Sequence, residues 1–318
     1  MQPETKPSDR QPPGANSQLP LWPLQPAGSQ QPESQHESSL AEFHSAESAS
    51  EHTDETAGSP QEPPGVVRVV MPLVINDPPW TLADLAHFVL FTVAASFLLM
   101  ALYATGFALL REVFGWTVRP EIALSGIPVL LSMQLIIEGL CGLFIYLIIT
   151  RKYGRSFWEA IRWIRRRDLE ARFLFAGVAM ALALNLLSNF FPTHEHLPVE
   201  DWFSSTASAY AVALVGICIA PFIEELVFRG FFYPVFERRW GMPSAVLLTA
   251  GLFAALHGFQ LAWSWQEVSV IFFVGVTLSY TRGKTGSLAP SFLMHLSYNA
   301  SLFVSLYLTT DQFRKLQG

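Results

Sequence analysis

Apolar side chains gather in long runs that begin about eighty residues into the chain. A helix needs about 20 mainly apolar residues to cross the hydrocarbon core of a bilayer, and shorter spans are tolerated where protein surrounds them. Seven runs are candidates, at 82–110, 123–150, 173–191, 207–222, 243–258, 268–280 and 288–308. With part of 224–240 as an eighth, the pattern predicts an all-α polytopic membrane helix bundle of about seven or eight transmembrane helices.

The residues before the first run have the opposite character. Segment 1–65 is rich in Pro, Gln, Ser and Glu and contains few large apolar side chains. Such a segment cannot bury enough surface to offset the entropy lost on ordering, so we expect a disordered N-terminal tail. Segment 66–204 should then hold the first membrane helices and a basic loop, and 205–318 the remaining helices.

Charge separates the tail from the membrane part and predicts an orientation. Residues 1–80 hold eleven of the 26 acidic residues and three of the 20 basic ones, so the formal net charge of −6 belongs to the tail. The loop 151–172 carries eight Lys or Arg, which places it in the cytoplasm by the positive-inside rule. The chain crosses the membrane twice between this loop and the basic residues near 238, and twice more before those near 283. All three basic segments therefore fall on the same side of the membrane. We therefore expect a cytoplasmic tail, and the plasma (inner) membrane if the organism is bacterial.

Ionisable residues within apolar runs indicate a structural or functional role, because placing each charged side chain in the membrane costs about 2.5–3.5 kcal/mol on insertion scales. In the stretch EELVFR, Glu225 and Arg229 are four residues apart, the spacing of a pair on one helix face. Glu224 points about 100° away on a helix and is free to face a cavity as a general base. The alternative is a cytoplasmic helix end with ordinary solvated charges.

Two further clusters lie on later runs. His257 ends the apolar stretch GLFAALH, while His295 and Asn299 share a helix face and could offer two donors to a developing oxyanion. The alternatives are a core histidine bonded to a backbone carbonyl and a hydrogen bond between helices. A Glu, two His and an Asn from different helices predict either a water-activating hydrolytic site or a metal site.

These clusters resemble the three motifs of the CAAX-protease and bacteriocin-processing (CPBP, ABI-type) family of intramembrane proteases. EELVFR resembles its EExxxR motif, FAALH its FxxxH motif and HLSYN its HxxxN motif, over about residues 205–308. The resemblance implies a peptidase core at 205–318 that cuts membrane-associated or lipid-modified substrates. It implies that Glu224 and His257 activate water and that His295 and Asn299 hold the oxyanion.

The resemblance further implies that Glu225 and Arg229 are structural, positioning residues, and it leaves the cofactor open. Glu224, His257 and His295 could hold zinc with one open position, or a metal-free glutamate mechanism could operate. The sequence lacks HExxH, the compact zinc signature. The expected partners are membrane lipid and a peptide or membrane-protein substrate, and no nucleic acid.

Two other functions fit the same residues. A non-catalytic membrane scaffold or immunity-type protein would keep them for helix packing. A small transporter would use buried Glu and His as proton relays, although such sites usually lie between repeated halves. Glu138, in the second run, could line a substrate cavity or pair with Arg229, and the alternative is a buried residue without a functional role.

Overall fold

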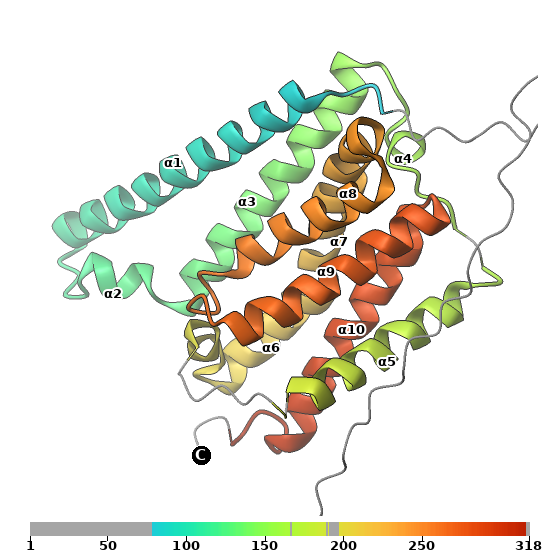
Figure 1. Ribbon diagram of the computed structural model, residues 1–318. Helices are drawn as coiled ribbons and strands as arrows, with labels where there is room; N and C mark the ends of the chain where they lie inside the picture. Colours follow the sequence, from blue (N-terminus) through green and yellow to red (C-terminus); the bar gives the residue numbers. More distant parts are fainter. Residues whose placement is uncertain (1–77, 166, 189, 191–196, 316–318) are drawn as a thin grey trace, which may run out of the picture. The chain divides into compact units, whose positions relative to one another are not determined.

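The computed structural model describes residues 78–165, 167–188, 190 and 197–315, which form helices, turns and connections without a strand (Figure 1). The predicted all-α fold is therefore confirmed for this part of the chain. The predicted tail, 1–65, lies outside the described residues.

Within the described residues, four helical segments are long and apolar enough to cross a membrane. They are α1 (Leu82–Phe114), α3 with the π-helical turn η1 (Ile127–Lys152), α5 (Glu170–Ser188) and the segment Thr206–His257. The last two predicted runs form α9 (Trp265–Thr285) and α10 (Leu288–Thr309). Shorter helices occupy the connections: α2 (Pro120–Leu124), α4 (Phe157–Ala160) and the 3₁₀-helix η2 (Pro198–Phe203).

The segment Thr206–His257 joins three stretches that the hydropathy pattern separates. In order, it contains α6 (Thr206–Leu214), π-helical turn η3 (Val215–Ile219), α7 (Ala220–Glu225), π-helical turn η4 (Leu226–Phe232) and α8 (Tyr233–His257). At Gly241 the backbone has φ 77° and ψ 168°, a conformation that glycine enters far more readily than other residues, so α8 bends there. The π-helical turns flank α7, which carries both motif glutamates, and such turns are frequent at functional sites.

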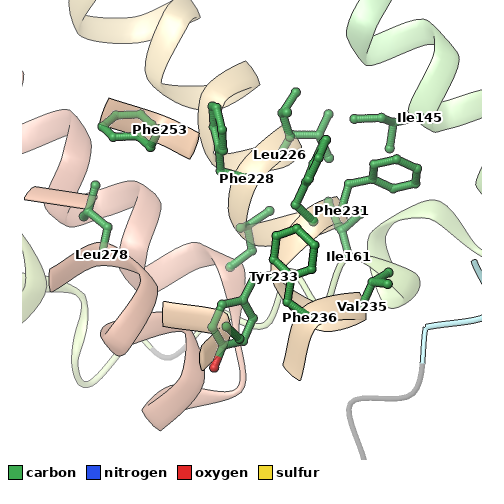
Figure 2. Close-up of a cluster of buried hydrophobic side chains, with 14 of the residues drawn as sticks. Ile145, Ile161, Leu226, Phe228, Phe231, Tyr233, Val235, Phe236, Phe253 and Leu278 are labelled. Carbon is green, nitrogen blue, oxygen red and sulfur yellow. The ribbon is translucent and has the colours of Figure 1, made fainter. Parts of the chain in front are cut away.

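The hydrophobic core surrounds η4 and the start of α8. Figure 2 shows buried side chains of this stretch, among them Leu226, Phe231 and Tyr233, with Ile145 of α3 and Leu278 of α9. By contrast, outer helices expose large apolar side chains along much of their length, especially α1. A bilayer would solvate such surfaces, which fits an integral membrane protein.

The remaining helices frame this central segment. Helix α8 packs along α9, α10 packs along α5, and α3 contacts α1 on one side and α7 and η4 on another (Figure 1). Helices α7, α8 and α10 therefore bring the three sequence motifs into one region.

Candidate active site

Glu225 and Arg229 form the predicted ion pair, with Arg229 Nη1 donating to Glu225 Oε1 at 2.9 Å. Both side chains are fully buried. Arg229 also donates from Nε to Ser279 Oγ (3.2 Å) and from Nη2 to the Gly275 carbonyl (3.1 Å) on α9. The pair thus fixes the α7–η4 region against α9. Sequence reasoning missed these α9 contacts, because a serine and a glycine carbonyl within an apolar run carry no distinguishing pattern.

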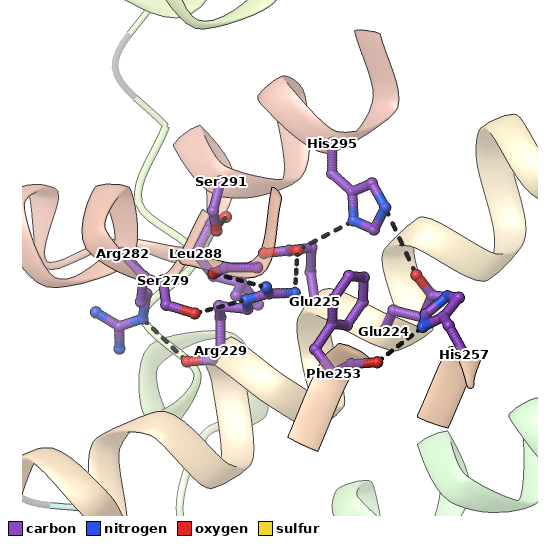
Figure 3. Close-up of polar contacts among 11 residues, drawn as sticks. Glu224, Glu225, Arg229, Phe253, His257, Ser279, Arg282, Leu288, Ser291 and His295 are labelled. Atoms are coloured by element: carbon purple, nitrogen blue, oxygen red, sulfur yellow. Dashed lines mark hydrogen bonds and ion pairs between the residues drawn. The ribbon is translucent and has the colours of Figure 1, made fainter. Parts of the chain in front are cut away.

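His295 of α10 lies between the two glutamates (Figure 3). Its Nδ1 is 3.1 Å from Glu225 Oε1, and its Nε2 is 3.6 Å from Glu224 Oε2. Because Glu225 pairs with Arg229 and is an acceptor, Nδ1 of His295 is assigned as the donor of that contact. The imidazole is therefore oriented by Glu225 and presents Nε2 to Glu224.

His257, at the end of α8, is held in a similar way. Its Nδ1 is 2.8 Å from the carbonyl oxygen of Phe253, which can only accept, so Nδ1 carries the hydrogen. Its Nε2 lies 3.8 Å from Glu224 Oε1. The structure thus contains the backbone contact of an ordinary core histidine, and that contact orients the other nitrogen toward Glu224.

Glu224 stands where the two imidazoles meet. Its side chain is 21% exposed, whereas that of Glu225 is 0% exposed. Its two contacts with the histidines, 3.6 and 3.8 Å long, exceed direct hydrogen-bond distance. A water molecule can bridge polar groups at this separation. Of the adjacent glutamates, Glu224 is therefore the one that can reach water or a ligand.

Asn299, one turn beyond His295 on α10, makes a different contact. Its Nδ2 donates to the carbonyl of Gly216 in η3 at 2.7 Å, which is a hydrogen bond between helices. The structure shows no hydrogen bond from Asn299 to His295 or Glu224 among its described contacts. The oxyanion role of Asn299 stays a prediction.

The predicted zinc ligands, Glu224, His257 and His295, lie near one another but are not arranged as a metal site. Among residues 78–165, 167–188, 190 and 197–315, no group of three or more His, Cys, Asp or Glu side chains lies close enough to hold a metal ion. Glu224, His257 and His295 have suitable chemistry, since each imidazole presents Nε2, but they are not grouped as ligands in this arrangement. The zinc hypothesis stays a prediction.

Comparison with known proteins agrees with the motifs. Residues 206–301 match the family model described as Type II CAAX prenyl endopeptidase Rce1-like, and this segment contains every motif residue from Glu224 to Asn299. UPF0177 protein YbdI of Lactococcus lactis subsp. lactis (strain IL1403) is 29% identical over 135 residues, which cover 42% of this chain and 69% of that protein. No solved structure matches. The resemblance to CAAX-type intramembrane proteases is thus confirmed at the level of the family.

Proposed function

We propose that this protein is an intramembrane endopeptidase that hydrolyses peptide bonds of membrane-associated or lipid-modified substrates. The observation that carries the proposal is the position of Glu224. It is a partly exposed carboxylate faced by Nε2 of two histidines, each oriented through its other ring nitrogen. Such an arrangement suits a general base with a positioned proton acceptor beside it.

In the proposed reaction, a water between Glu224 and His257 donates one hydrogen bond to each side chain and keeps both of its hydrogens until it attacks. As its oxygen bonds to the scissile carbonyl carbon, Glu224 takes the proton, and the carbonyl electron pair moves to the oxygen to form an oxyanion. The C–N bond then breaks, and the proton passes from Glu224 to the leaving nitrogen. The products are a carboxylic acid and an amine.

The oxyanion role of His295 sets a condition on its protonation. Nδ1 already donates toward Glu225, so a donor at Nε2 requires hydrogens on both ring nitrogens. The two carboxylates that face this ring are Glu224 and Glu225. Asn299 would supply a second donor through the amide hydrogen that Gly216 does not use.

The test is cleavage of a farnesylated C-terminal peptide, carrying a fluorophore and a quencher, by the purified full-length protein in phospholipid nanodiscs. Glu224→Gln should lower kcat/KM by roughly 10³-fold, because the amide cannot take the proton. Its melting temperature should stay near that of the parent, since Glu224 makes no direct hydrogen bond shorter than 3.5 Å to either histidine.

Glu121→Gln, the same change at an exposed glutamate of α2, is the matched control and should retain full activity. Full activity in Glu224→Gln would refute the hydrolytic assignment. Loss of stability without any cleavage by the parent would instead support the scaffold alternative, which the buried Glu225–Arg229 pair and the Asn299 contact also fit. Metal analysis of the purified parent tests the zinc hypothesis separately.

A further inference from the structure

A third carboxylate, Glu138, lies in the middle of the buried face of α3. Leu131, Glu138 and Ile145 are seven residues apart and therefore share one face of the helix. Leu131 belongs to a buried cluster with Val212 of α6, and Ile145 lies in the main core. This face of α3 thus packs against the segment that carries the motif glutamates, and Glu138 is midway along it.

The packing of α3 on α7 brings Glu138 close to Glu224. Gly142, one turn after Glu138, approaches α7 so closely that a Cβ there would lie 3.3 Å from Ile223 Cδ1. Ile223 directly precedes Glu224 in the chain. Glu138 and Glu224 therefore come from the stretches of α3 and α7 that pack against each other.

The hydrogen bonding of Glu138 is half complete. Its Oε1 accepts from Gln134 Nε2 at 2.8 Å, whereas Oε2 is buried and has no hydrogen-bond partner among the described residues. The pairing of Glu138 with Arg229 that the sequence allowed is not found, because Arg229 donates to Glu225 and to α9. A buried acceptor without a donor is unfavourable, so a donor from outside the chain would complete the site.

We infer that Glu138 Oε2 is a substrate-binding acceptor that takes a hydrogen bond from a backbone N–H of the peptide, next to the scissile bond. An extended peptide loses the water on its N–H groups when it enters a dry site, and each then requires an acceptor. A carboxylate on the face of α3 that packs against α7 offers this acceptor. The inference rests on the proposed function and adds a binding contact to it.

The variant Glu138→Gln tests this contact with little change in shape. If the Gln oxygen continues to accept from Gln134, the amide nitrogen takes the place of Oε2 and presents a donor to the peptide N–H. KM for the farnesylated peptide should rise about tenfold or more while kcat changes little. Ser132→Ala, on the same helix but bonded to Tyr103 of α1, is the matched control and should leave KM unchanged.

A series of peptides in which one backbone N–H at a time is replaced by an ester oxygen identifies the donor. At one position the ester should raise KM for the parent by a similar factor and have little effect on Glu138→Gln. A lower kcat with unchanged KM in Glu138→Gln would place Glu138 at the attacking water and overturn the inference, as would equal ester effects in both proteins.

The same experiment separates this inference from the proposed function. Cleavage by the parent with an unaltered KM in Glu138→Gln would refute the peptide contact alone. Peptide affinity, measured by fluorescence anisotropy on parent and Glu138→Gln, tests the contact even if the parent does not cleave, and equal affinities would overturn it.

Discussion

Two regions of the molecule each contain a carboxylate largely withdrawn from water, and the two differ in how their oxygens are satisfied. Asp84, at the start of α1, is 1% exposed and accepts hydrogen bonds from Lys152, the Tyr153 hydroxyl, and the backbone N–H and hydroxyl of Thr81. Glu224, on α7, is 21% exposed, and among the described residues its polar contacts are the two long ones to His257 of α8 and His295 of α10.

The difference distinguishes a structural carboxylate from one available for chemistry. The bonds to Asp84 cap α1 and tie it to Lys152 of η1 and to Tyr153, so both carboxylate oxygens already have donors. Glu225 is also held by its neighbours, since Arg229 and His295 both contact its Oε1, whereas its buried Oε2 has no hydrogen-bond partner among the described residues. Glu224 is surrounded by oriented groups that do not bond to it directly, which is the condition expected of a residue that must bind water or substrate.

The largest effect on stability should come from Arg229→Met, which removes the charged partner of the buried Glu225. It leaves Glu225 as a buried charge without its partner and removes the bonds to α9, so we expect a loss of about 3–5 kcal/mol in the free energy of unfolding. Thermal unfolding in detergent measures it. A melting temperature equal to that of the parent would contradict the structural role of the pair.

Asn299→Ala should have an intermediate effect that separates packing from catalysis. Loss of the bond to the Gly216 carbonyl should cost about 1 kcal/mol of stability. If Asn299 also contacts the oxyanion, kcat should fall by about 10²-fold or more with KM little changed. A variant that loses stability but keeps its kcat would show that Asn299 serves helix packing only.

Sequence patterns could predict the helices and the Glu225–Arg229 pair, because hydropathy and a four-residue spacing are local properties. They could not predict that the helical segment beginning at Thr206 runs through EELVFR as far as the bend at Gly241, since the charges of EELVFR resemble a helix end. The ion pair neutralises those charges within the core, so the helix continues through them.

The acceptors that orient the site could be predicted only in part. The sequence suggested a backbone carbonyl as a partner of His257, but nothing in it showed that this contact would direct Nε2 toward Glu224. The contacts of Ser279 and Gly275 depend on how closely α9 approaches η4, a property of the packed helices that no local pattern records.

The smallest effect should come from Asp84→Asn. It replaces a carboxylate by an amide, as Glu224→Gln does, but at a residue whose oxygens already accept hydrogen bonds from the protein. The amide keeps the shape but weakens the contacts with Lys152 and Tyr153, so we expect a loss of about 1 kcal/mol and an unchanged kcat/KM. Thermal unfolding and peptide cleavage, measured side by side, should give opposite results for the two variants. Equal losses of activity in both would mean that hydrogen-bond satisfaction does not distinguish the structural carboxylate from the catalytic one.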